Sequence, residues 1–180
     1  MDTQLVHRSA LLREFVTQGP QVALAVQLLG PNVCFTHQQF VIKYPDEKRR
    51  TDIPWHQDNG YGRLEPPRDL TVWIALDDCT SANGCLWVLP GSEREGLKPH
   101  RDIGGLRGVA VTADGVALPM RAGTAALFGS LLLHRSLPNT TATPRVALYL
   151  RYCDPTVTMV DSGRNVLDDG YSWMVAGEAP

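Results

Sequence analysis

The chain has 180 residues, of which 43% are hydrophobic, and a formal net charge of -2 at pH 7. This length and balance predict one soluble globular domain over residues 1–180 that is large enough to bury a core. They exclude an extended basic surface of the kind that binds nucleic acid, since the densest basic run, Lys48-Arg49-Arg50, is too short. No apolar stretch in the sequence reaches the length of a membrane span.

The four cysteines lack the C-x-x-C spacing that is typical of zinc clusters and redox centres. Free, buried thiols in a reducing compartment are therefore expected for Cys34, Cys79, Cys85 and Cys153. These features predict a cytoplasmic protein, monomeric or homodimeric, without nucleic-acid or membrane partners.

Two helices are expected to open the chain. The first runs over residues 9–17, and the second begins near Pro20 and ends at Gly30-Pro31. Proline suits the first turn of a helix and glycine its end. The second helix has an apolar stripe at helical spacing, formed by Val22, Val26 and Leu29. Residues 1–30 are thus predicted to be a short helical lead-in.

From residue 31 onward the pattern changes to short strands separated by glycine, proline and asparagine. Asn83-Gly84 is typical of a tight hairpin turn. The expected strands cover residues 33–43, 70–76, 85–90, 115–118, 124–128, 131–134 and 145–153. Many short strands behind a helical start favour a mostly β fold, a sandwich or jelly-roll-like barrel with its core over residues 31–153.

Two segments fit the strand pattern less well. Residues 94–114 are rich in glycine and charged side chains without a clear period, so we expect a loop over the mouth of the barrel. Residues 154–180 are mostly polar and are expected to form a tail or a lid.

The most informative motif is His56-Gln57-Asp58, together with His134 far downstream. Residues two apart on a strand project from one face, so His56 and Asp58 are expected to share an ion while Gln57 points away. His134 would complete a 2-His-1-carboxylate triad, which is typical of non-haem Fe(II) oxygenases. By itself, His-x-Asp often occurs by chance. Zinc is the main competing metal, although its sites more often use thiolates or three strong ligands around a water.

Arg145 and Ser136 predict a site for an acid co-substrate. A 2-oxo acid can take two open positions of such a metal and leave one for O2, and its far carboxylate then needs a fixed cation. A planar guanidinium pairs with a carboxylate better than an ammonium does. Arg145 opens a strand expected beside His134, and Ser136 lies two residues from His134 on the same strand face. Taken alone, Arg145 would be read as a surface salt bridge and Ser136 as a strand-end cap.

Four segments resemble the phytanoyl-CoA dioxygenase family: residues 53–58 (IPWHQD), 70–78 (LTVWIALDD), 83–92 (NGCLWVLPGS) and 133–136 (LHRS), the last followed by Arg145. The resemblance covers about residues 30 to 152 and is more specific than the histidine motif alone. It implies an Fe(II)- and 2-oxoglutarate-dependent oxygenase on a double-stranded β-helix core, a jelly roll of the cupin kind. Family members act on diverse small molecules, so the resemblance leaves the substrate open.

Carried over by position, the resemblance implies roles for seven side chains. The iron ligands would be His56, Asp58 and His134. The clamp for the far carboxylate of 2-oxoglutarate would be Arg145 with Ser136, and the walls or polar contacts of the same pocket would be Trp73 and Gln39. Lys43 could face the same cavity, but as a lysine at a strand edge it is expected to lie in solvent.

The expected activity is hydroxylation of a small molecule, with O2 and 2-oxoglutarate as co-substrates and succinate and CO2 as products. The carboxylate of Asp58 favours hydroxylation over halide transfer, which needs a vacant ligand position. The alternative is a non-catalytic, cupin-like metal- or ligand-binding domain or a truncated, inactive family member, because only about thirty residues precede the first core strand. A zinc hydrolase would need a water-activating base, for which the sequence offers no clear candidate.

Overall fold

The computed structural model describes residues 5–45 and 51–180, so the Lys48-Arg49-Arg50 run lies outside the described residues. Three helices open this part of the chain: α1 (Leu5–Arg8), α2 (Ala10–Gln18) and α3 (Pro20–Leu29). Among the described residues, no helix combines the length and the hydrophobicity that crossing a bilayer requires.

Local sequence signals fix the ends of α2 and α3. The Ser9 hydroxyl caps α2 by accepting a hydrogen bond from the backbone N–H of Leu12. Pro20 begins α3, and Gly30, with a φ of 111°, ends it. The two predicted helices are thus confirmed to within about one residue. The four-residue α1 was not predicted, because one turn carries no periodic pattern.

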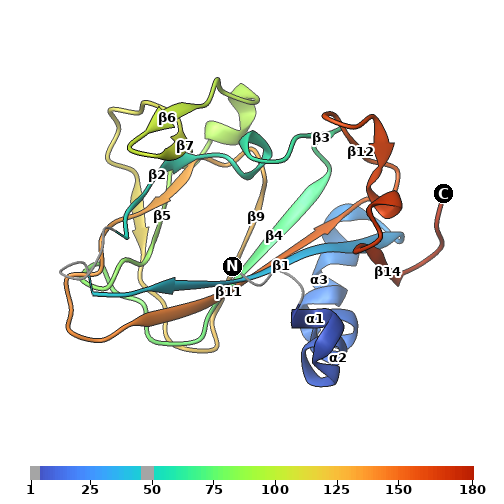
Figure 1. The fold of residues 1–180 in the computed structure, drawn as a ribbon, viewed down its shortest axis with the longest axis horizontal. Helices are drawn as coiled ribbons and strands as arrows, with labels where there is room; N and C mark the ends of the chain where they lie inside the picture. Colours follow the sequence, from blue (N-terminus) through green and yellow to red (C-terminus); the bar gives the residue numbers. More distant parts are fainter. Residues whose placement is uncertain (1–4, 46–50) are drawn as a thin grey trace.

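The larger of two facing antiparallel sheets has the strand order β14-β1-β11-β4-β9. Its strands are β1 (Val33–Lys43), β4 (Asp69–Ala75), β9 (Ala125–Gly129), β11 (Arg145–Cys153) and β14 (Trp173–Ala176). The helices cover one face of this sheet (Figure 1), where Val16 and Ala25 pack into a core with residues of β1, β4 and β11. Because helices cover one face and the second sheet the other, every residue of the interior strand β4, which lies between β11 and β9, is buried.

The smaller sheet has the strand order β2-β10-β5-β8. Its strands are β2 (Ile53–His56), β5 (Leu86–Val88), β8 (Val116–Leu118) and β10 (His134–Ser136). A second core, which includes Trp73, Leu86, Val88 and Phe128, joins residues of this sheet to residues of the larger one. Two antiparallel sheets that face each other behind a helical start confirm the predicted mostly β, jelly-roll fold.

Several short elements differ from the expected loop and tail. Residues 94–114 contain the hairpin of β6 (Arg101–Ile103) and β7 (Leu106–Gly108), preceded by the short helix η2 (Ser92–Glu95). The segment 154–180 contains β12 (Thr158–Met159), β13 (Arg164–Asn165) and η3 (Val166–Asp169) before β14. Strand β12 pairs with β3 (Leu64–Glu65), and β14 pairs with β1. The end of the chain is therefore not a loose tail but an edge strand of the larger sheet.

Candidate metal centre

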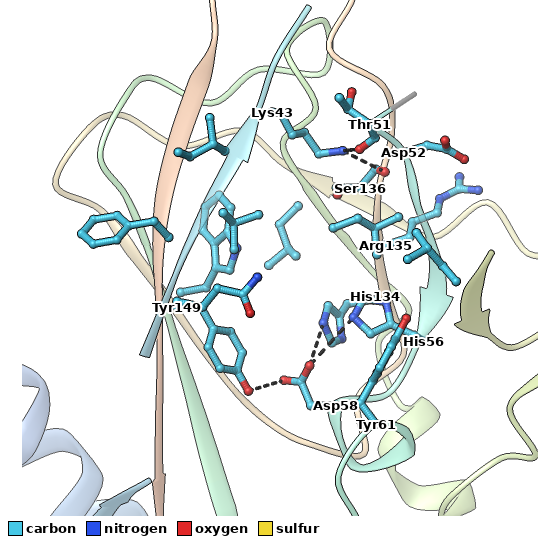
Figure 2. Close-up of a pocket in the computed structure, with 18 of the residues that line it drawn as sticks. Lys43, Thr51, Asp52, His56, Asp58, Tyr61, His134, Arg135, Ser136 and Tyr149 are labelled. Atoms are coloured by element: carbon cyan, nitrogen blue, oxygen red, sulfur yellow. Dashed lines mark hydrogen bonds and ion pairs between the residues drawn. The ribbon is translucent and has the colours of Figure 1, made fainter. Parts of the chain in front are cut away.

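The two predicted histidines and the carboxylate converge between the sheets. His56 ends β2 and is the register partner of His134, the first residue of β10. Asp58 follows at the start of the short helix η1 (Asp58–Gly60). The Nε2 atoms of His56 and His134 lie 3.8 Å and 3.5 Å from Asp58 Oδ1 (Figure 2). One ligand atom from each residue falls within 4.8 Å of the other two, so the three could hold one ion.

The residue between the ligands turns away, as the alternation predicted. Gln57 has an extended backbone, with φ -117° and ψ 137°, and its side chain is completely buried. Its amide donates to the carbonyls of Gly96 and Leu131, at 2.9 Å and 2.6 Å, and accepts from the Lys98 N–H at 2.7 Å. Gln57 thus connects the end of β2 to the loop ahead of β6, which fixes the positions of His56 and Asp58 on either side of it.

The hydrogen bonds of the two imidazoles leave Nε2 free to bind a cation. His56 Nδ1 lies 2.9 Å from the carbonyl oxygen of Pro54, and His134 Nδ1 lies 3.0 Å from that of Leu132. A carbonyl oxygen only accepts, so each Nδ1 carries the proton, and the neutral tautomer has a lone pair on Nε2. Burial, and then the adjacent His134, lower the pKa of His56 to about 3, so this ring is neutral at ordinary pH.

The carboxylate of Asp58 is held in one orientation by two hydroxyls. Its Oδ2 accepts from Thr71 Oγ1 at 2.7 Å and from the Tyr149 hydroxyl at 3.3 Å, which directs Oδ1 toward the imidazoles. Burial opposes its charge, but the neighbouring histidines, the Thr71 hydrogen bond and Arg151 together keep the pKa of Asp58 below its ordinary value. Burial raises the pKa of Tyr149, so its hydroxyl remains a donor. An ionised carboxylate facing two nitrogen lone pairs is a donor set that suits a divalent transition metal.

Replacing Thr71 with valine should lower the affinity for Fe(II) by about 10- to 100-fold, the usual effect of losing a partner that orients a metal ligand. Valine has the same shape but cannot donate to Asp58 Oδ2, so the carboxylate loses its shorter hydrogen bond. Anaerobic Fe(II) titration measures the change. Thr36→Val is the matched control, because the Thr36 hydroxyl bonds a backbone carbonyl of β11 instead. Equal affinities for wild type and Thr71→Val would contradict this role.

A cavity of about 660 Å³ opens beside the three ligands. All seven predicted site residues line it: His56, Asp58, His134, Arg145, Ser136, Trp73 and Gln39. Arg145 is 1% exposed, and its guanidinium lies 5.2 Å from the centre of the Trp73 ring. Its Nη2 donates to the carbonyl of Gly84 at 2.6 Å, and its Nε has no hydrogen-bond partner among the described residues. Within the described part of the chain, Arg145 forms no ion pair with a carboxylate.

Lys43 corrects one expectation, because it is buried in the cavity wall and not solvent-exposed. It is 1% exposed, and its Nζ donates to the carbonyl of Leu137 at 2.8 Å and to that of Thr51. Pairing of β1 with β11 sets Lys43 directly opposite Arg145. Gly84 leaves room for this side chain, since a Cβ at Gly84 would lie 2.6 Å from Lys43 Cδ. The burial of a lysine at the end of a strand can be predicted only when the neighbouring strands are known.

Thr71 and Tyr149 are the site residues that the sequence interpretation missed. Period-two alternation within strands already assigned would have found them. Thr71 lies two residues before Trp73, and Tyr149 lies four after Arg145. Each therefore shares a sheet face with a residue that was predicted to line the pocket.

Comparison with known proteins gives one family for most of the chain. The family model described as Phytanoyl-CoA dioxygenase (PhyH) matches residues 2–147. The peroxisomal phytanoyl-CoA dioxygenase of Homo sapiens is 32% identical over 145 residues, which cover 73% of this chain and 43% of that protein. This chain therefore spans less than half the length of that relative.

Solved structures of similar fold include the apo form of the non-heme monooxygenase ThoJ. It superimposes with a TM-score of 0.78 at 25% identity, covering 98% of this chain and 72% of that one. The epimerase SnoN, in complex with Fe3+, alpha ketoglutarate and nogalamycin RO, superimposes with a TM-score of 0.74 at 26% identity. That match covers 93% of this chain and 68% of SnoN.

Proposed function

The chain belongs to the phytanoyl-CoA dioxygenase family, and on this premise we propose that it is an Fe(II)- and 2-oxoglutarate-dependent dioxygenase that hydroxylates a small molecule. The observation that carries the proposal is the meeting of the His56, Asp58 and His134 donor atoms in one cavity with the buried cation of Arg145. Fe(II), 2-oxoglutarate and O2 together supply the oxidation, in which a C–H bond becomes C–OH while 2-oxoglutarate gives succinate and CO2.

The metal would be held by His56 Nε2, His134 Nε2 and Asp58. The distances of 3.8 Å and 3.5 Å from the two Nε2 atoms to Oδ1 leave space for an ion between neutral imidazoles and an ionised carboxylate. Thr71 and Tyr149 keep the carboxylate turned toward the ion. A carboxylate ligand at position 58 also favours hydroxylation over halide transfer, which needs that position vacant.

The far carboxylate of 2-oxoglutarate would pair with the guanidinium of Arg145, with the hydroxyl of Ser136 as a second donor. Arg145 and Ser136 are both buried and line the cavity, and Trp73 backs the guanidinium. A buried cation without a carboxylate partner among the described residues is costly, and a dicarboxylate ligand offsets that cost. Gln39 and Lys43 line the same cavity and would make its wall polar.

The protein's own contribution would be geometry and exclusion of water. The two histidines and the residues proposed to hold 2-oxoglutarate lie on paired strands of two sheets. Asp58 follows β2 at the start of η1 and is held by the hydroxyls of Thr71 and Tyr149, so the relative positions of all these groups are fixed before any ligand binds. The cofactor and co-substrates supply the chemistry. Among the loops, residues 59–68 and 94–114 are the candidates for selecting the substrate.

Anaerobic addition of Fe(II) and 2-oxoglutarate tests the proposal directly. The chelate of the two has a weak visible charge-transfer band, which we expect on mixing and which should be followed by succinate formation when O2 is admitted. Metal analysis of protein produced without added metal separates iron from zinc. If the protein binds metal but shows no charge-transfer band and forms no succinate, it is a non-catalytic, cupin-like binding domain, and the proposal is wrong.

A further inference from the structure

The cavity has a second basic position, at the far end of β11 from Arg145. Arg145 and Arg151 both line the cavity, six residues apart on one face of the strand, so their Cα atoms are separated by roughly 20 Å. The register pairs of β1 and β11 place Lys43 opposite Arg145 and His37 opposite Arg151. Tyr149, which contacts Asp58, lies between the two ends. The metal centre therefore separates two basic ends of one cavity.

Only one of these ends is within reach of the co-substrate. A five-carbon diacid that binds the metal and extends to Arg145 cannot also contact Arg151, on the other side of Tyr149. Arg151 nevertheless lies close enough to the centre to affect the pKa of Asp58 and that of His37. The end of the cavity at Arg151 and His37 thus stays open for the molecule that is oxidised.

The guanidinium of Arg151 is fixed in place without using all its hydrogen-bond donors. Its Nε donates to Asp69 Oδ2 at 2.6 Å, and Asp69 also accepts from the hydroxyl of Ser130. The Asp69 side chain is completely buried and is not among the residues that line the cavity, so it holds the guanidinium from behind. Arg151 Nη2 has no partner among the described residues.

His37 adds a neutral donor or acceptor beside this cation. Burial, and then the charge of Arg151, lower its pKa, which favours the neutral ring. Charge over the whole wall favours an anion. Of the charged side chains that line the cavity, four are cationic (Lys43, Arg135, Arg145, Arg151), and two are carboxylates (Asp52, Asp58), one of which is the candidate metal ligand; counting Asp69, which pairs with Arg151 from behind the wall, cations still outnumber carboxylates by four to three.

We propose that the molecule oxidised by this protein carries an anionic group, a carboxylate or a phosphonate or phosphate, and that Arg151 with His37 binds that group on the side of the metal centre away from Arg145. The inference rests on the proposed function. It makes Arg151 and His37 specificity-determining residues, since the anion would orient the rest of the substrate toward the metal. A guanidinium that is already fixed loses little conformational freedom when it binds an oxyanion.

The test compares acids with uncharged analogues in protein loaded anaerobically with Fe(II) and 2-oxoglutarate. Pentanoate and benzoate are matched with their primary amides, and methylphosphonate with its dimethyl ester, and binding is followed by calorimetry and by the change in the charge-transfer band. We expect each acid to bind about ten-fold more tightly than its analogue, the effect of one hydrogen bond to a charged group. The Arg151→Met/Asp69→Asn double variant should lose this preference while its dissociation constant for 2-oxoglutarate stays within about two-fold of wild type.

The double variant removes both charges of the buried pair together, which avoids leaving an unpaired carboxylate. His37→Leu provides a second, independent variant and should weaken the preference several-fold even if the double variant fails to fold. Arg121→Gln, at an exposed position ahead of β9 and outside the cavity, is the control and should keep the preference for acids. Acids and analogues that bind equally to wild type, or a preference that survives in both variants, would overturn the inference alone. A wild-type protein without the chelate band would overturn the proposed function as well.

Discussion

Replacing Asp58 with alanine should lower both Fe(II) affinity and 2-oxoglutarate turnover by at least about 100-fold. This exceeds the loss expected from removing a residue, such as Thr71, that only hydrogen-bonds a metal ligand. Asp58 supplies the only carboxylate among the three donors that converge, and its Oδ1 faces both Nε2 atoms. Two neutral imidazoles alone would hold Fe(II) weakly and without a charge to balance the ion. Anaerobic Fe(II) titration and succinate formation after admission of O2 measure the two effects.

Folding of this variant should be preserved, which separates a functional loss from a structural one. The lowered pKa of Asp58 means that its charge stabilises the metal-free fold at neutral pH, so the variant should melt at a lower temperature than wild type but stay folded under the assay conditions. Asp154→Ala is the matched control: that carboxylate pairs with Arg68 at 2.9 Å, outside the cavity, and its removal should leave succinate formation unchanged. Near-normal succinate release by Asp58→Ala would contradict the assignment of Asp58 as a metal ligand.

Side chains on regular strands were predictable from the sequence, because alternation fixes the face on which they lie. The spacing of His56 and Asp58 predicted that both would face one ion and that Gln57 would point away. In the structure the donor atoms converge and Gln57 turns away, although β2 ends at His56 and Asp58 begins η1, so the extended backbone of Gln57 and not a continuous strand sets this arrangement. The site residues on distant strands were predicted in a different way. His134 was proposed as the second histidine that a facial triad needs and Arg145 as the cation that an acid co-substrate needs, and a resemblance that spans four motifs supported both, since no local pattern predicts that β10 pairs with β2.

What could not be predicted depends on pairing between distant segments. The edge strand β14 forms only because β1 offers it a free edge, and its own sequence does not alternate clearly. The β6–β7 hairpin consists of strands of three residues, too short for a periodic signal. Lys43 likewise is buried because β1 continues for eleven residues beside β11, which brings its end inside the cavity. In each case the deciding contacts are long-range.

Replacing Arg145 with glutamine should weaken the binding of 2-oxoglutarate by about 100-fold while leaving Fe(II) binding unchanged, since losing one partner of a buried charge pair usually costs between about 2 and 5 kcal/mol. Glutamine retains a donor for the carbonyl of Gly84 but cannot form paired, charged hydrogen bonds with a carboxylate. The affinity of Arg145→Lys for 2-oxoglutarate should lie between those of wild type and Arg145→Gln, because lysine keeps the charge but loses the paired hydrogen bonds. Anaerobic titration of 2-oxoglutarate against the Fe(II)-loaded protein gives the dissociation constants.

The same substitution should leave the ligand-free protein as stable as wild type or more stable. Burial lowers the pKa of Arg145, so its charge is a cost to the folded state, and among the described residues no carboxylate is left unpaired when it is removed. Binding of 2-oxoglutarate with Fe(II) should therefore raise the melting temperature of wild type far more than that of Arg145→Gln. Arg94→Gln, whose side chain is 86% exposed, is the control and should behave as wild type. If the Arg145 variant binds 2-oxoglutarate normally, the far carboxylate is held elsewhere in the cavity.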